Sequence, residues 1–279
     1  MRLFAALVSR LPLPVSGALA TVLAAIWWWL LPIRRSVALD NLDRAARFSE
    51  KNNPNHDPAM WAPGPVLRAS VRGTLLSLFE ALRHARRPLE KLTTEGWEEL
   101  IERTGRGEGS LILTGHGSAW ELVGFVAARR LKLPVTVIVR TPTSRGSAAV
   151  VEAMRRSAGL ELLPPEGSFF AASKALREGR VVVFLLDQRH NSGLEVDLFG
   201  EPALTSKGLA LLARRSGAPL FPAWQRREGL GAHHFTIYPA LPMEESVEEQ
   251  TRSYMRFYEE RIMERPSEWL WMHNRWRRP

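Results

Sequence analysis

The chain has 279 residues, of which 45% are hydrophobic, so it is long enough to bury a complete core as one domain. It contains no cysteine, which excludes disulfides, thiolate metal sites and a cysteine nucleophile. Its formal charge of +9 favours an acidic partner such as an anionic lipid or an acidic protein, but the basic residues are scattered pairs without a known nucleic-acid motif, so we expect no nucleic acid.

The first predicted element is an uncharged apolar stretch from Leu11 to Ile33, which ends in three tryptophans before Arg34 and Arg35. Its length is just sufficient to cross a bilayer, and tryptophans beside arginines are typical of the headgroup boundary. A spanning helix, a helix that lies in the membrane interface and a buried core helix all remain open. Prolines and a glycine in the first turns favour an embedded or shallowly inserted helix.

This stretch divides the chain into a membrane-associated segment, residues 1–35, and a main domain, residues 36–279. A cleaved signal peptide is not expected, because the apolar stretch is too long and its tryptophan-rich end is no small-residue cleavage site. More arginines follow the apolar stretch than precede it, which predicts that the main domain lies on the cytoplasmic side.

The main domain is predicted to alternate between helices and strands. Helical spacing of apolar residues is found at 36–48, 66–85, 121–131, 147–159, 168–179, 206–217 and 246–264. Short apolar runs typical of strands are found at 110–115, 134–140, 179–187, 218–224 and 233–240. Continuous β-branched runs between amphipathic helices favour an α/β fold with a mixed, mostly parallel central sheet flanked by helices.

The stretch LILTGHGSAWELVG, residues 111–124, places His116 just past the carboxyl end of a predicted buried strand. Open α/β sheets have their ligand sites at that edge. Gly115 and Gly117 permit a sharp turn and a close approach of substrate to the backbone. Ser118 is a good N-cap for the helix that follows. The pattern therefore indicates a functional role for His116.

Glu121 has two interpretations. Ser118 and Glu121 have the spacing of a capping box, in which the glutamate returns to the Ser118 amide. The glutamate, in the first turn of the helix, could instead bond His116, fix its tautomer and stabilise the imidazolium. Both interpretations point Glu121 toward the loop that carries His116, so capping and catalysis do not exclude each other.

A family resemblance favours the catalytic interpretation. HGSAWE is a His-x4-Glu motif and resembles the H-x4-D/E signature of glycerolipid acyltransferases. More specifically, the chain resembles the late acyltransferases of lipid A biosynthesis, the lauroyl and myristoyl transferases, and relatives that acylate other glycolipids. The likeness covers nearly the whole chain, in ordered blocks that include VVVFLLDQRH, VDLFGEPALTSKGLALLARRSGAPLFPAW and PSEWLWMHNRW. The Phe-Pro-Glu-Gly motif of the wider acyltransferase group is absent.

The resemblance implies a glycerolipid acyltransferase-like fold and a membrane-associated O-acyltransferase of lipid A and lipopolysaccharide biosynthesis, on the cytoplasmic face of the inner membrane. The enzyme would move a fatty acyl chain from acyl carrier protein or coenzyme A to a hydroxyl of a lipid A precursor or related glycolipid. His116 would be the general base and Glu121 its orienting partner. A thiolate leaves readily, so no metal and no cofactor is expected. The acceptor, the acyl chain length and the donor remain open.

Polar residues at the ends of the next two predicted strands are further site candidates. Arg140 could bind a phosphate or stabilise the oxyanion, or could be a solvated residue at a strand end. Asp187, Gln188 and Arg189 follow the next strand. Asp187 could be a second carboxylate near His116 and Arg189 a headgroup ligand, although a plain turn would also explain these residues.

Two other classes of protein remain as alternatives. One is a hydrolase on the same fold, in which His116 activates water. The other is a non-enzymatic protein that binds membrane surfaces through its basic residues. The cluster of Trp269, Trp271 and Trp276 beside Arg275, Arg277 and Arg278 is predicted to be an interfacial patch.

Overall fold

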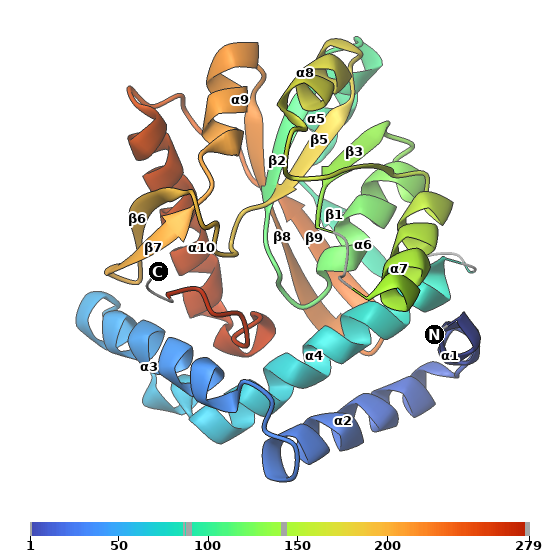
Figure 1. Ribbon diagram of the computed structural model, residues 1–279, viewed down its shortest axis with the longest axis vertical. Helices are drawn as coiled ribbons and strands as arrows, with labels where there is room; N and C mark the ends of the chain where they lie inside the picture. Colours follow the sequence, from blue (N-terminus) through green and yellow to red (C-terminus); the bar gives the residue numbers. More distant parts are fainter. Residues whose placement is uncertain (1, 86, 88–90, 141–143, 277–279) are drawn as a thin grey trace.

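A mixed β-sheet lies at the centre of the molecule (Figure 1). The computed structural model describes residues 2–85, 87, 91–140 and 144–276, and within them seven strands form this sheet in the order β1-β9-β8-β2-β5-β3-β4. In chain order these strands are β1 (Leu92–Glu95), β2 (Ser110–Thr114), β3 (Val135–Ile138), β4 (Glu161–Leu163), β5 (Val181–Leu185), β8 (Leu220–Gly229) and β9 (Ala232–Ile237).

The strands of the sheet run in two directions. β8, β2, β5, β3 and β4 are parallel to one another. β9 is antiparallel to β8, and β1 is parallel to β9, so this edge of the sheet runs the opposite way. The predicted mixed, mostly parallel sheet is therefore confirmed.

Both faces of the sheet are buried, which explains the continuous apolar runs of its central strands. All five residues of β2 are buried; Leu111 and Leu113 belong to one hydrophobic cluster, whereas Ile112 belongs to the other. Such alternation follows from side chains that point to opposite faces of a strand. The two clusters are therefore the cores on the two sides of the sheet.

Helices cover each side. The first core includes residues of α3 (Arg35–Asn52), α8 (Phe169–Arg177), α9 (Gly208–Ser216) and α10 (Val247–Glu264). The second core includes residues of α5 (Glu98–Gly105), α6 (Trp120–Phe125) and α7 (Arg145–Ser157). Helix α4 (Pro63–His84) contributes to both cores, and Figure 1 shows it running across the lower end of the sheet. The helices predicted in the main domain are all present.

The apolar N-terminal stretch forms α2 (Leu13–Trp29), which follows the short α1 (Arg2–Val8) and lies beside α4 in Figure 1. The face of α2 toward the protein is buried and consists mostly of small residues with one tryptophan: Ser16, Gly17, Ala20, Ala24 and Trp27. The opposite side of α2 and the turn after it are exposed and apolar: Val15, Val22, Trp29, Leu30, Leu31 and Ile33. One face of α2 therefore packs as a core helix does, and the other faces solvent.

Among the residues that the structure describes, no helix combines the length and the apolar character that a membrane crossing requires.

Several short elements were not predicted. β1 is a polar edge strand, LTTE, and β4 has only three residues, so neither has an apolar pattern. β6 (Leu194–Leu198) and β7 (Glu201–Thr205) form a separate hairpin. Its turn holds Phe199 and Gly200, both at positive φ. Such a two-residue turn usually carries asparagine or aspartate before the glycine, and a phenylalanine there conceals the hairpin signal.

Candidate active site

His116 and Asp187 come together because they follow two neighbouring parallel strands. β2 and β5 pair in register with Thr114 opposite Leu185, and each polar residue lies two positions beyond its strand's last paired residue. The Nδ1 atom of His116 lies 2.7 Å from Oδ1 of Asp187. The second carboxylate that the sequence predicts near His116 therefore contacts its ring directly.

Asp187 is buried, and its second oxygen is also engaged. Oδ2 accepts the backbone N–H of His116 at 2.7 Å and the indole N–H of Trp269 at 2.8 Å. Burial raises the pKa of this carboxyl, but the adjacent His116 and these hydrogen bonds outweigh burial and hold the pKa at about 2. Asp187 is therefore an ionised acceptor at neutral pH, and it favours the His116 tautomer with hydrogen on Nδ1.

The other ring nitrogen of His116 is left as an acceptor. Its Nε2 atom lies 3.2 Å from the side-chain amide nitrogen of Gln188. The imidazole side chain is 16% exposed and lies on the ring of Trp120, with 5.4 Å between ring centroids. His116 thus has one nitrogen held by a buried carboxylate and the other at the boundary of a cavity.

The two glycines beside His116 are explained by close packing rather than by a left-handed backbone, since neither has a positive φ. A Cβ atom on Gly115 would lie 3.0 Å from Oδ2 of Asp187 and 2.9 Å from the ring of Tyr258. A Cβ atom on Gly117 would lie 2.5 Å from the amide nitrogen of Gln225. The side chains of Asp187, Tyr258 and Gln225, rather than a substrate, therefore occupy the space that the two glycines leave open. This packing places Asp187 against the loop that carries His116.

The structure pairs Glu121 with Arg155 and not with His116. The guanidinium of Arg155 donates from Nε at 3.0 Å and from a terminal nitrogen at 2.7 Å, and both side chains are nearly buried. The predicted capping box is wrong: α6 begins after Ala119, which has no side chain to cap it, and the buried hydroxyl of Ser118 has no hydrogen-bond partner among the described residues. Arg155, which the sequence did not single out, turns Glu121 away from the histidine.

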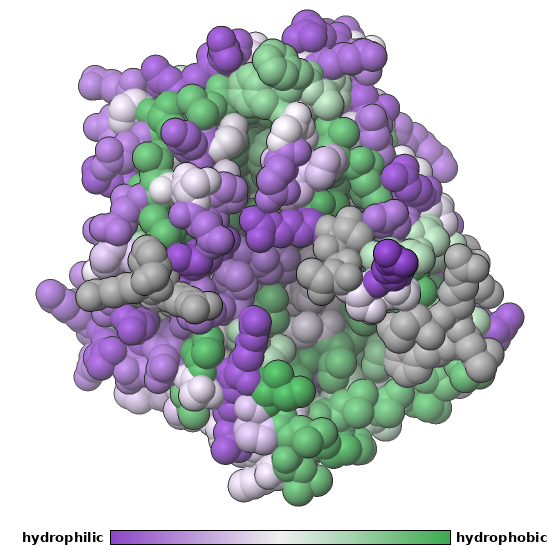
Figure 2. All heavy atoms as spheres, viewed as in Figure 1, coloured by the Kyte–Doolittle hydropathy of each residue, from purple (hydrophilic) through white to green (hydrophobic). Residues whose placement is uncertain are grey.

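A cavity of about 340 Å³ opens beside His116, at the carboxyl ends of β3 and β5 and between α8 and α9. Its apolar wall includes Ile138, Phe169, Ala172, Phe184, Leu186 and Leu212. Figure 2 shows apolar surface between α8 and α9 at the top of the view and hydrophilic side chains below it. The cavity therefore has an apolar part and a polar part.

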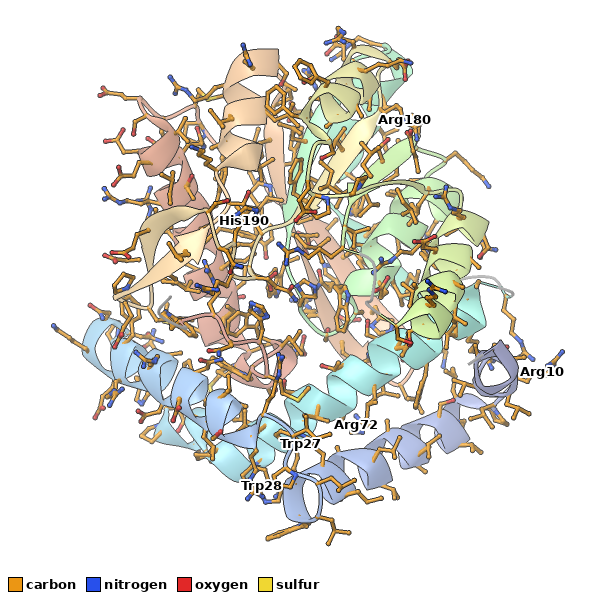
Figure 3. The ribbon with its side chains drawn as sticks, in the orientation of Figure 1. Arg10, Trp27, Trp28, Arg72, Arg180 and His190 are labelled. Atoms are coloured by element: carbon orange, nitrogen blue, oxygen red, sulfur yellow. The ribbon has the colours of Figure 1, made fainter. Side chains whose placement is uncertain are left out.

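The polar part contains the other predicted site residues. Gln188 and Arg189 line the cavity next to His116, and His190, labelled in Figure 3, follows them. Arg140 is exposed, lies 3.5 Å from Glu166 and lines the same cavity, as does Arg155. Among the described residues, no group of three or more histidines and carboxylates could hold a metal ion.

The predicted interfacial tryptophan patch is wrong. Trp269 and Trp271 are buried, as is Arg275, which donates to the backbone oxygen of Leu204 and to the hydroxyl of Thr205. Trp276 is half-buried, and Arg277 and Arg278 lie outside the described residues. The buried aromatic and basic residues of this cluster therefore pack in the core beside Asp187 and do not form an exposed surface patch.

Residues 266–276, the C-terminal segment, close over His116 and Asp187. Leu270 donates its backbone N–H to the carbonyl of His116 at 3.2 Å. The segment is tied down from the helices beneath it by Asn41, which donates to the carbonyls of Trp271 and His273, and by Ser70, which donates to the carbonyl of Trp269. These bonds hold the Trp269 indole in the position from which it donates to Asp187.

A buried ion cluster supports the loop from the other side. Arg227 donates to the carbonyl of Ser118 at 3.0 Å and to the carboxylate of Glu80 at 2.6 Å. His233 lies 3.1 Å from the same carboxylate, and Glu80 is fully buried. Burial raises the pKa of Glu80, but the adjacent His233 and Arg227 outweigh it and lower the pKa to about 2. The loop that carries His116 is thus held from both directions.

A neutral histidine in the C-terminal segment predicts a pH effect on stability. Burial lowers the pKa of His273 from 6.5 to about 4, and its Nε2 accepts the backbone N–H of Arg189 at 2.8 Å. Between these pH values the unfolded chain binds a proton that the folded chain does not, so this contribution to stability falls as the pH falls. His273→Gln keeps an acceptor without a titrating group and should show a shallower loss of unfolding free energy between pH 6.5 and 4. Urea denaturation at several pH values measures this, and parallel curves would contradict it.

A histidine paired with a buried carboxylate beside a partly apolar cavity, on the carboxyl edge of an α/β sheet, is typical of an enzyme active site. The chain belongs to the bacterial lipid A biosynthesis acyltransferase family, whose sequence model matches residues 4–278. The protein is therefore an acyltransferase, and the resemblance found in its motifs is confirmed.

Individual relatives support the same assignment. The chain is 29% identical to a phosphatidylinositol mannoside acyltransferase of Mycobacterium tuberculosis, over 65% of this chain and 58% of that protein. It is 24% identical to the enzyme of that name from Mycolicibacterium smegmatis, over 95% of this chain and 93% of the relative. It is 34% identical to the lipid A biosynthesis lauroyltransferase of Escherichia coli, over 37% of this chain and 36% of the relative.

Proposed function

We propose that this enzyme transfers a fatty acyl chain from a thioester, carried by acyl carrier protein or coenzyme A, to a hydroxyl of a lipid A precursor or a related glycolipid. The observation that carries the proposal is the position of His116, bonded to Asp187 through Nδ1 and lining an apolar cavity. The relatives' names support a glycolipid acceptor, since they name lipid A and phosphatidylinositol mannoside.

In the proposed reaction His116 is the general base. Its Nε2 takes the proton of the acceptor hydroxyl, in the position that the Gln188 amide occupies in the free enzyme, as the hydroxyl oxygen attacks the thioester carbonyl. The tetrahedral intermediate collapses with cleavage of the C–S bond, and the thiolate leaves and takes a proton from the imidazolium. Asp187 holds the ring and stabilises its positive charge during these steps.

The arginines of the polar part bind the charged parts of the substrates. Arg140 and Arg189 line the cavity, and among the described residues neither forms an ion pair with a buried carboxylate. Each can therefore donate hydrogen bonds to a phosphate of the acyl donor or of the acceptor. Arg155 is held in a fixed orientation by Glu121 and lines the cavity near the reacting centre. In this proposal Glu121 contributes to catalysis through Arg155, which can stabilise negative charge on the carbonyl oxygen.

The test is a transfer assay with the full chain, a purified glycolipid acceptor, and acyl carrier protein and coenzyme A thioesters in parallel. Mass spectrometry should detect the acylated acceptor in excess over free fatty acid. Release of fatty acid alone would support the hydrolase instead. If acyl carrier protein is the donor, the arginines should steer its acidic surface, so the apparent donor affinity should fall as salt rises. A donor affinity that does not change with salt would contradict steering of an acidic carrier surface and would favour coenzyme A held mainly through its acyl chain.

We further propose that residues 1–35 attach the enzyme to the cytoplasmic face of the inner membrane. The exposed apolar residues after α2 support this, together with arginines beside the tryptophans: the guanidinium of Arg35 lies 5.4 Å from the Trp28 ring centroid. In Figure 3, Trp27 and Trp28 lie where α2 ends, and Arg72 extends from α4 toward α2. An apolar helix face bordered by arginines suits the boundary of an anionic bilayer.

Charge on this surface should weaken membrane binding. Because α2 also covers part of α4, point substitutions test the surface better than deletion of the segment. Leu30→Glu combined with Ile33→Glu should weaken binding to anionic vesicles by about tenfold or more, since burial of each side chain is worth roughly 1.5–3 kcal/mol. Met243→Glu, at an exposed apolar position next to α10, is the matched control. Equal vesicle binding by both variants in a flotation assay would refute the proposed surface.

A further inference from the structure

Phe169 separates the cavity from a second hollow. A groove of about 680 Å³ runs along α8 and past the end of α9. Among the described residues that line the cavity, Phe169 alone also lines this groove. Removal of its ring would therefore join two spaces that are now distinct.

The two spaces lie at opposite ends of the sheet. The cavity is lined by residues at the carboxyl ends of strands, such as Ile138 and Leu186. The groove is lined by Gly109 and Ala218, which come just before the amino ends of β2 and β8. Phe169, the first residue of α8, stands between them. The groove thus continues the cavity in the direction away from His116.

The Phe169 ring packs between α8 and α9. The guanidinium of Arg215, on α9, lies 5.8 Å from the ring centroid. The ring of Phe170 meets it edge-on, with 6.0 Å between centroids and an angle of 89°. Phe169 itself is half-buried against the first core, whereas Phe170 is 80% exposed. A large ring fixed between α8 and α9 can act as the end wall of the cavity.

We propose that Phe169 sets the upper limit on the length of the acyl chain that the enzyme transfers. This inference rests on the proposed function, in which the acyl chain lies in the cavity with its thioester at His116. A chain that fills the cavity places its terminal methyl group against the Phe169 ring. A longer chain must displace the ring or leave methylene groups in water, and one excess methylene in an apolar pocket already costs a rate factor of about ten or more.

Phe169→Ala should open the cavity into the groove, where Phe170, Leu176 and Ala218 offer apolar surface to the end of a longer chain. The test uses the full chain with one acceptor and a ladder of saturated donors that differ by two carbons, supplied in competition. The ratio of product from the next longer donor to product from the preferred one should rise about fifteenfold, because the two added methylenes contribute roughly fourfold each when buried. Phe170→Ala is the matched control, because it removes the same side chain from the groove alone.

Two further variants protect the test against misfolding of the alanine variant. Phe169→Leu should shift the preference toward longer chains by a smaller factor, and Phe169→Trp should shift it toward shorter ones. An unchanged chain-length profile in variants that still transfer acyl groups, or an equal shift in Phe170→Ala, would overturn the role of Phe169. Absence of transfer by the unsubstituted enzyme from every donor would instead refute the proposed function.

Discussion

His116→Ala is expected to lower the rate of acyl transfer by roughly 10²–10⁴-fold, the usual contribution of a general base. The substitution removes the Nε2 acceptor at the cavity and leaves the Asp187 carboxylate with its two N–H donors from the backbone of His116 and from Trp269. The protein should therefore remain folded. Initial rates measured with a saturating donor, together with a thermal unfolding curve, check both parts.

His234→Ala is the control for the loss of an imidazole. His234 lies on β9 and bonds Thr93 and Glu95 on the neighbouring strand β1, and it lines no part of the cavity. Its substitution should leave the rate nearly unchanged. Transfer by His116→Ala at a rate near that of the unsubstituted enzyme would exclude His116 as the base.

Asp187→Asn should lower the rate of acyl transfer almost as much as His116→Ala does, because it reverses the tautomer of His116. The two N–H groups at Oδ2 can only donate, so the amide oxygen of asparagine must face them and its NH₂ group must face Nδ1. Hydrogen then moves to Nε2, which can no longer accept the proton of the hydroxyl. The equivalent change in a hydrolytic triad lowers the rate about 10⁴-fold.

Glu121→Gln distinguishes the contribution of Glu121 to the rate from that of Asp187. Glutamine can still accept one hydrogen bond from Arg155, so we expect a loss of less than about tenfold, well below that of Asp187→Asn. Both variants should be assayed under the same conditions, with unfolding curves to exclude misfolding. A larger loss in Glu121→Gln than in Asp187→Asn would mean that Glu121 acts on His116 in the complex with substrate.

The edge of the sheet that carries the site could be predicted from the sequence. The apolar runs before His116 and Asp187 are continuous and β-branched, and parallel strands bring their carboxyl ends to one edge. Apolar runs do not reveal which strands are neighbours in the sheet. The direct contact of His116 with Asp187 therefore became evident only from the observed strand order, in which β5 lies beside β2.

The role of Glu121 could not be predicted, because its partner is distant in the chain. Arg155 lies 34 residues away on α7, and a charged pair in a nearly buried position outweighs a local capping bond. The same Ser-x-x-Glu spacing does form a cap at Ser246, where Glu249 is exposed and, in the part of the chain that the structure describes, forms no ion pair with an arginine. Local spacing alone does not distinguish these two cases.

The C-terminal tryptophans were misassigned for a related reason. Tryptophans beside arginines suit a membrane boundary, but the same side chains bury well when each polar group finds a partner. Trp269 donates to Asp187, Trp271 donates to the carbonyl of Pro266, and Arg275 donates to residues of β7. Pro266 is local, but Asp187 and the residues of β7 lie about 70 to 80 positions away and are brought to these side chains only by the tertiary fold.

The position of residues 266–276 has a consequence for the biogenesis of the enzyme. The ribosome makes the strands that carry His116 and Asp187 long before it adds Trp269, so a nascent chain has both side chains before the indole that donates to the carboxylate. The indole reaches Asp187 only when residues 266–276 dock onto α3 and α4. We therefore expect a chain that is released or clipped before residue 269 to lack this donor and to transfer acyl groups more slowly than the full chain.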